Sequence, residues 1–333
     1  MGKSLKEAQD EFYTLIDSLD ERVMSSFLNW IGDSFLESGP SKSPFVEKAN
    51  LTLREIAQHL RLKLPSSATL SSENVLWPSV GFDSDCNAKN TAHVDCFLFE
   101  DEDLNRLVDE GKLTRNYCVD CGSRQTKPLT FISHSLSIPQ LEFIFTSVVP
   151  LTKQKEGFHV IDIGSRLGGI VSAAHLFSRG KARVTGIEMN EELCKLQESI
   201  VESYGLSSVT VINSDVRLQK EVLSTADLVI MNNVFSFFMP LDEQLSCWES
   251  VHSSLRPGTL LIHNPSIDDV TSHLTLPFTI SQWLSPMKTK VAASKFAKGD
   301  EDLFEDLCTL HLYKVREPSC ESENNGKKTE GDD

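Results

Sequence analysis

A short turn made of small and acidic residues holds the side chains of this chain that are best placed for ligand chemistry. Asp162, Gly164, Ser165 and Gly168 follow a run of β-branched apolar residues and precede a helical pattern. Glycine lets a backbone approach a ligand closely, and the N-terminus of a helix favours polar or negatively charged groups. The turn therefore predicts a nucleotide-type binding site between a strand and a helix.

Two acidic residues end the next two strand-like runs. Glu188 lies near the end of the run 183–189, and Asp215 ends the run 209–215. A carboxylate at the end of the second strand can accept hydrogen bonds from both hydroxyls of a ribose, which a phosphate on that ribose would forbid. The carboxylate after the third strand, or its neighbouring amides, can bind an adenine amino group. The pair of acids points to a ligand with an adenosine part.

The elements that must position these groups are a series of buried strands. Runs of β-branched and apolar residues predict them at 160–163, 183–189, 209–215, 226–235 and 258–265. A helix is predicted at 170–177, directly after the turn. A last strand is predicted near the end of the chain, at 307–315, where apolar and polar residues alternate.

This series resembles the class I S-adenosylmethionine (AdoMet)-dependent methyltransferases over residues 137–317, a little over half of the chain. The resemblance implies an α/β fold with a seven-strand, doubly wound, mostly parallel sheet, and AdoMet as cofactor. In that family the glycine turn wraps the methionine part, the second acid holds the ribose and the third lies by the adenine. The implied cofactor-binding residues are Asp162, Gly164, Ser165, Gly168, Glu188, Asp215 and Asn232. Arg166 is a departure, because the family usually has glycine there; its side chain could crowd AdoMet or reach the acceptor.

The resemblance places the methyl acceptor beside the residues that follow the fourth strand. Asn232, Asn233 and Phe235 lie there, in a run similar to that of the non-SET histone lysine methyltransferases, and they are the implied catalytic residues. Amide carbonyls can orient an acceptor amine, and an aromatic wall excludes water. Alternatively, the asparagines cap the strand and Phe235 belongs to the core. His263 is a further general-base candidate, and Trp283 a candidate for the acceptor pocket.

Two alternatives to AdoMet binding remain for the turn. A dinucleotide-binding domain would carry G-x-G-x-x-G after the first strand, and this turn does not have that spacing. A fold of this kind with an empty site is the second alternative. Five strands in order, with acids ending two of them, favour AdoMet.

Two pairs of metal-ligand residue types, each with two residues between its members, lie outside the predicted sheet. They are His93 with Cys96 and Cys118 with Cys121. Such pairs can place four soft donors tetrahedrally around one ion, so they predict structural Zn²⁺. Alternatively, the first pair is ordinary and partly buried, or the second is a redox pair, although no thioredoxin-like strand precedes it. Spare ligands are Cys86 and His134.

Composition limits the partners. The chain has 333 residues, 40% of them hydrophobic, and a net charge of −16. This charge makes nucleic acid an unfavourable partner and favours a protein or small-molecule methyl acceptor. No apolar run is long enough to span a membrane, and the N-terminus does not resemble a signal peptide. We expect no membrane association and a cytoplasmic or nuclear location; composition does not indicate an oligomeric state.

The chain is predicted to have four parts. They are a helical N-terminal region at 1–85, a zinc-binding module at 86–135, an AdoMet-binding methyltransferase domain at 136–317 and a disordered tail at 318–333. Apolar residues spaced along the first helical stretch are expected to pack in a core. Two functions are compatible with this organisation. One is an active N-methyltransferase, favoured by Glu188 and Asp215; the other is a catalytically silent AdoMet-fold protein that acts as a zinc-containing interaction module, favoured by Arg166.

Overall fold

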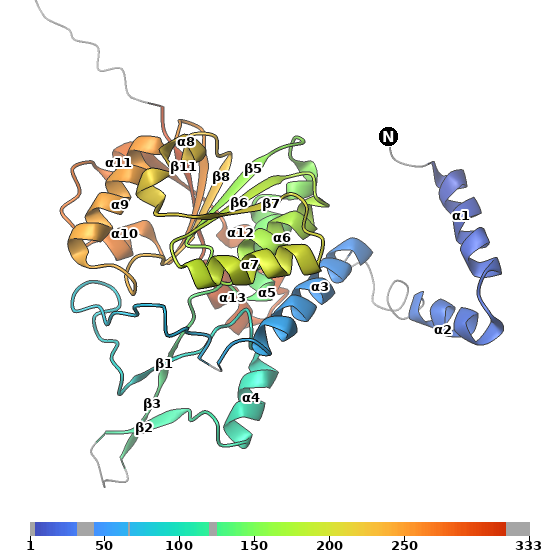
Figure 1. Ribbon diagram of the computed structural model, residues 1–333, viewed down its shortest axis with the longest axis horizontal. Helices are drawn as coiled ribbons and strands as arrows, with labels where there is room; N and C mark the ends of the chain where they lie inside the picture. Colours follow the sequence, from blue (N-terminus) through green and yellow to red (C-terminus); the bar gives the residue numbers. More distant parts are fainter. Residues whose placement is uncertain (1–3, 32–42, 66, 120–124, 318–333) are drawn as a thin grey trace, which may run out of the picture. The chain divides into compact units, whose positions relative to one another are not determined.

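The computed structural model describes residues 4–31, 43–65, 67–119 and 125–317, and the predicted tail at 318–333 lies outside these ranges (Figure 1). The chain divides into two compact units, Met1–Leu51 and Thr52–Asp333. No helix of the described residues has both the length and the apolar character that a membrane span requires.

The first unit contains α1 (Leu5–Asp17) and α2 (Glu21–Ile31), and α3 (Pro44–Arg61) begins in it. A capping box starts α1: the Ser4 hydroxyl accepts from the backbone N–H of Glu7, and the Glu7 carboxylate accepts from that of Ser4. Phe12, Leu15 and Val23 are exposed. The core packing predicted for this stripe is therefore not found in the described residues.

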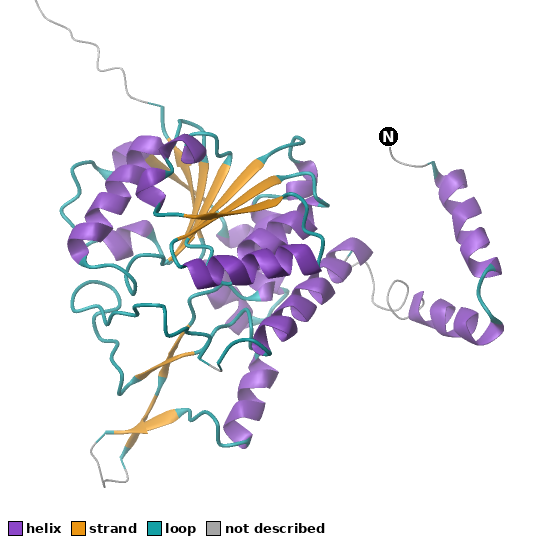
Figure 2. Ribbon diagram, viewed as in Figure 1, coloured by secondary structure: helices purple, strands orange, loops and turns teal. Residues whose placement is uncertain are grey.

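The second unit is built on one seven-stranded sheet, whose strands appear as a fan in Figure 2. The strands are β5 (His159–Ile163), β6 (Arg183–Glu188), β7 (Val209–Asn213), β8 (Leu228–Asn232), β9 (Leu260–Asn264), β10 (Leu284–Met287) and β11 (His311–Val315). Their order is β10-β11-β9-β8-β5-β6-β7, with β5 to β9 parallel and the two final strands antiparallel to their neighbours. The predicted mostly parallel seven-strand sheet is confirmed.

The chain winds from β5 towards one edge of the sheet and returns at β8 to build the other half. Helices cover both faces (Figure 2). The helices are α5 (Ile138–Phe143), α6 (Gly169–Ser178), α7 (Glu191–Ser203), α8 (Lys220–Leu223), α9 (Leu241–Ser254), α10 (Ile267–Thr271), α11 (Ile280–Trp283), α12 (Lys290–Ala297) and α13 (Glu301–Cys308). Strand order reverses between β5 and β8, which is where open α/β sheets place ligand crevices.

A segment with little regular structure precedes the sheet. Its elements are α4 (Asp101–Asp109) and four short strands, β1 (Thr91–His93), β2 (Asn116–Cys118), β3 (Thr126–Pro128) and β4 (Thr130–Ile132). β1 pairs with β4 in parallel, and β2 pairs with β3 antiparallel. In the chain, α4 lies between the two pairs of metal-ligand residue types. This segment supplies several side chains to the site described next.

Candidate functional site

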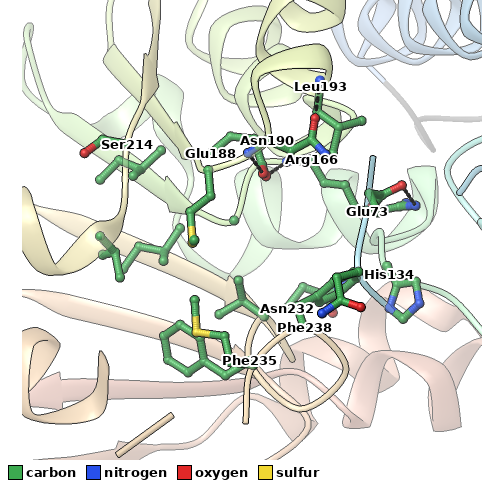
Figure 3. A pocket seen from close by; sticks show the side chains of 18 of the residues that line it. Glu73, His134, Arg166, Glu188, Asn190, Leu193, Ser214, Asn232, Phe235 and Phe238 are labelled. Atoms are coloured by element: carbon green, nitrogen blue, oxygen red, sulfur yellow. Dashed lines mark hydrogen bonds and ion pairs between the residues drawn. The ribbon is translucent and has the colours of Figure 1, made fainter. Parts of the chain in front are cut away.

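A cavity of about 320 Å³ lies at the carboxyl ends of the central strands, where the strand order reverses (Figure 3). Gly164 follows β5, Glu188 ends β6, Ser214 follows β7 and Asn232 ends β8, and all four line the cavity. Four parallel strands therefore direct their ends to one space. The sequence placed a ligand at this edge, and the cavity lies there.

Backbone geometry around Gly164 requires glycine. Its φ is 71°, and a Cβ added to it would lie 2.0 Å from a methyl carbon of Val234. Gly168, with a φ of 76°, is the N-cap of α6. A side chain at Gly164 would displace the loop after β8, so this glycine keeps the two loops in contact at the cavity wall.

Glu188 has its carboxylate held by two backbone amides. One oxygen accepts from the N–H of Arg166 at 3.0 Å, and the other accepts from the N–H of Asn190 at 2.8 Å. Burial raises the pKa of this carboxyl, and the two amide bonds oppose that shift. Each carboxylate oxygen accepts more than one hydrogen bond. Glu188 can therefore receive two hydroxyl groups from a ligand in the cavity.

Two acids from the preceding segment, Glu73 and Asp95, direct Arg166 away from the centre of the cavity. Figure 3 shows the contact with Glu73. Arg166 donates from Nε to Glu73 at 2.8 Å and from Nη1 to Asp95 at 3.0 Å, and a third bond goes to the carbonyl of Ala68. All three charged side chains are almost fully buried. Arg166 contributes to the cavity wall, but its guanidinium charge is paired with the carboxylates of Glu73 and Asp95. It is thus neither extended across the cavity nor available to an acceptor.

Asp162 is the penultimate residue of β5 and is 2% exposed. No described residue donates a hydrogen bond to either of its carboxylate oxygens. Burial, followed by the nearby charge of Glu188, raises the pKa of Asp162 well above its ordinary value. The hydroxyl of Ser165 and the side-chain amide of Gln197 are likewise buried without a partner in the described chain. Neither Asp162 nor Ser165 lines the cavity.

Asp215 does not line the cavity, although its neighbours Ser214 and Val216 do. It caps the short helix η4 (Val216–Leu218) by accepting from the N–H of Arg217 at 2.8 Å. The Arg217 guanidinium also donates to this carboxylate, at 3.0 Å from Nε, and lowers its pKa. The structure therefore does not place the Asp215 carboxylate at the cavity, where the predicted ligand contact would lie.

The three predicted catalytic residues, at the end of β8 and in the loop that follows it, have different surroundings. Asn232 lines the cavity, and its side-chain oxygen accepts from the Asn264 amide at 2.9 Å. Phe235 also lines the cavity and packs edge-to-face on Trp248. Asn233 does not line it: its amide donates to Asp83 at 2.9 Å. Asn233 has a φ of 45°, a left-handed conformation that asparagine tolerates better than most residues.

Two further candidates from the sequence lie in the core. His263 is buried, donates from Nδ1 to the carbonyl of Pro265 at 2.6 Å, and has its pKa lowered to about 4 by burial. Trp283 is 6% exposed and packs edge-to-face on Phe278. Neither lines the cavity, so the predictions of a general base at His263 and of an acceptor pocket at Trp283 are wrong.

The predicted zinc site is not supported by the part of the chain that the structure describes. Within it, no group of three or more His, Cys, Asp or Glu side chains is arranged to hold a metal ion. His93 is hydrogen-bonded to His134 at 2.9 Å, and the partly buried Cys96 thiol donates to the carbonyl of Ser135. Cys118 is exposed on β2, and Cys121 lies outside the described residues.

The sequence analysis missed the part of the cavity wall that comes from the segment before the sheet. Ser72, Glu73, Asn74 and His134 line the cavity from there. His134 packs edge-to-face on Phe238, and burial lowers its pKa well below the ordinary value, so its ring is neutral. Glu73 has no local motif around it. His134 carried a signal only as a spare metal ligand.

The comparisons with known proteins agree with this geometry. Residues 154–310 match a family model described as "Methyltransferase domain". A curated protein of Sulfurisphaera tokodaii, named probable cobalt-precorrin-6B C(15)-methyltransferase (decarboxylating), is 30% identical over 90 residues. That match covers 23% of this chain and 47% of the relative, so this chain spans about half the length of the curated protein.

Similar solved structures include TrmN from Thermus thermophilus, with 14% identity, a TM-score of 0.35, and coverage of 45% of this chain and 43% of that chain. Precorrin-6y C5,15-methyltransferase from Geobacter metallireducens has 12% identity, a TM-score of 0.34, and coverage of 44% of this chain and 74% of that chain.

Proposed function

We propose that residues 154–310, which match the methyltransferase-domain family model, form an AdoMet-dependent methyltransferase domain, and that the chain is an active N-methyltransferase acting on a protein or small-molecule amine. The observation that carries this proposal is Glu188. Its carboxylate is fixed by two backbone amides at the edge of a cavity of about 320 Å³, at the strand where this superfamily holds the ribose.

The residues present fit AdoMet. Gly164 lets the turn pack closely on the loop after β8, and Asp162, two residues earlier in the chain, has no hydrogen-bond partner for its carboxylate among the described residues. In the proposed assignment the backbone of the turn at Gly164, which lines the cavity, holds the methionine part, and Glu188 binds the ribose hydroxyls. Ser165 and Gly168 belong to the same turn but do not line the cavity. The adenine is bound by the backbone around Ser214 and Val216, which line the cavity where Asp215 was expected.

AdoMet, when bound, supplies a methyl group that is already activated on a sulfonium, so the protein mainly aligns the acceptor. Phe235 and Phe238 form an apolar wall that excludes water from the reacting groups. Asn232 is held by Asn264 and faces the cavity, where its amide can orient an acceptor amine. Asn233 lies in the loop that follows, and its side-chain amide donates a hydrogen bond to Asp83.

The silent alternative rested on Arg166, and the contacts of this side chain argue against it. A side chain that filled the cavity would block AdoMet, whereas Arg166 is bound to Glu73 and Asp95. The acceptor is not given by the relatives: the curated one is named for cobalt-precorrin-6B and matches over 47% of its length. The net charge of −16 favours a basic protein or a small cationic molecule over nucleic acid.

Calorimetry of the full chain with AdoMet and with its demethylated product tests the binding half of the proposal, and both are expected to bind. Transfer of a labelled methyl group is then measured on a cell extract separated into protein, small-molecule and nucleic-acid fractions. Label in the first or second fraction is expected. Binding without label in any fraction would indicate the silent protein, and a folded chain that binds neither ligand would contradict the whole assignment.

A further inference from the structure

A second cavity, of about 300 Å³, adjoins the first and shares Met239 with it as a wall residue. One side of this cavity comes from the segment before the sheet, at residues 76–83, and the other from the loop after β8 and the start of α9, at residues 236–244. The N–H of Leu76 donates to the carbonyl of Phe237 at 2.7 Å. A backbone bond therefore joins the two walls.

Asp83 is the charged residue among those lining this second cavity, and none of the described lining residues is lysine or arginine. Its Oδ2 accepts from the Asn233 amide at 2.9 Å, while no described residue donates to its Oδ1. Burial raises the pKa of this carboxyl, with Asn233 opposing the shift. A partly buried carboxylate without a cationic partner leaves a charge that a bound cation would stabilise.

Aromatic side chains lie beside this carboxylate. Trp77 is 38% exposed and Phe82 is 57% exposed, and both line the cavity. Aromatic faces attract ammonium groups, and they pack on the methylene groups of a long alkylamine. An apolar, aromatic space with a carboxylate in it is suited to an alkylammonium group.

The backbone around this carboxylate is constrained from two sides. Gly81 has a φ of 84°, and a Cβ added to it would lie 2.3 Å from the His273 ring. Nδ1 of His273 is buried without a partner in the described residues, so a polar atom is available at this wall. Asn233 is left-handed and next to Asn232, which lines the first cavity. The loop after β8, which binds Asp83 through Asn233, is thus directly continuous with Asn232 in the proposed AdoMet site.

From this arrangement we propose that the second cavity is the acceptor subsite and that it binds a primary alkylammonium group, with Asp83 as the anion that receives it. Asp83 takes one proton from the bound ammonium, so that the neutral amine forms its bond to the methyl carbon as the bond from that carbon to the sulfonium sulfur breaks. The inference rests on the proposed methyltransferase function and narrows its acceptor to cationic alkylamines. Asn233 is a positioning residue, because it orients Asp83 and does not line the AdoMet cavity. Such a group comes from a lysine side chain of a protein or from a free amine.

The test uses two probes of matched shape on the full chain with AdoMet bound. They are N-acetyl-lysine methylamide and its uncharged analogue N-acetyl-norleucine methylamide, and binding is measured by calorimetry. We expect the lysine probe to bind at least tenfold more tightly. Equal binding of both probes by the wild-type chain would overturn the proposal without any mutation.

Asp83→Asn is expected to weaken the lysine probe at least tenfold and to leave AdoMet affinity within about twofold. Asp85→Asn is the matched control, since Asp85 is exposed two residues away and does not line the cavity. Unchanged probe binding in Asp83→Asn would contradict the inference. Failure of the wild-type chain to bind AdoMet would instead contradict the proposed function. Failure of the acceptor inference and failure of the proposed function are therefore distinguishable. Comparison of a lysine-containing pentapeptide with butylamine then separates the protein source from the free amine.

Discussion

Glu188 and Asp215 end or follow adjacent parallel strands, each has an arginine nearby in space, and they have opposite surroundings. The guanidinium of Arg166 binds Glu73 and Asp95, so Arg166 contacts Glu188 through its backbone N–H and not through its charge. The carboxylate of Glu188 therefore stays available on the side of the cavity that it lines. The guanidinium of Arg217 binds Asp215 directly. An acid at a strand end is therefore available to a ligand only where nearby cations are bound by other partners.

The first way to break this comparison is to remove the two arginine charges. Arg166→Gln is expected to lower the free energy of unfolding by about 3–5 kcal/mol, because it leaves the buried carboxylates of Glu73 and Asp95 without a cation. Arg217→Gln is the matched control and should cost about 1 kcal/mol or less, because its pair is partly exposed. Denaturant unfolding of both variants measures the difference.

A double variant checks the cause. Arg166→Gln combined with Glu73→Gln removes one of the uncompensated charges, and it should recover part of the lost stability. Equal destabilisation by the two single arginine variants would mean that the Arg166 pairs are no more important than a surface ion pair.

The second prediction concerns the available acid. Glu188→Gln keeps the shape of the side chain but replaces a charged acceptor, and it places an NH₂ group opposite one of the two backbone N–H donors. Hydrogen bonds to charged groups contribute about 1.5–3 kcal/mol, so AdoMet affinity is expected to fall roughly 10- to 150-fold. Calorimetry measures the affinity, and thermal unfolding verifies that the variant is folded.

A pH series gives this prediction a second readout. Burial raises the pKa of Glu188 above its ordinary value of 4.5, so the carboxylate gains its proton at a higher pH than an exposed glutamate would. Because the ribose hydroxyls need the ionised form as an acceptor, wild-type affinity should decrease as the pH falls towards that pKa. Glu188→Gln should lack this decrease, and a parallel pH response in both proteins would exclude Glu188 as its origin.

Much of the sheet could be predicted from the sequence because the information is local. Runs of β-branched residues gave five strands in order, and the glycine turn gave the start of α6. Side-chain partners were harder. Arg166 binds Glu73 and Asp95, which precede it in the chain by 93 and 71 positions. Asn233 binds Asp83, which precedes it by 150 positions. The spacing of neighbouring residues does not encode contacts over such separations. The two pairs of metal-ligand residue types are a second example, because the spacing within each pair does not determine whether the two pairs lie close together in space.

The smallest effect is expected at Asp215, and it sharpens the contrast with Glu188. Asp215→Asn keeps an oxygen that can accept from the N–H of Arg217, as the carboxylate does at the start of η4. What it loses is the ion pair with the Arg217 guanidinium, and a pair of this exposure contributes about 0–1 kcal/mol. Since the carboxylate does not line the cavity, AdoMet affinity should change by less than about fivefold. Titration of Asp215→Asn and Glu188→Gln side by side gives the comparison directly. A loss at Asp215 as large as the loss at Glu188 would show that Arg217 releases this carboxylate when AdoMet binds, and that both acids contact the ligand after all.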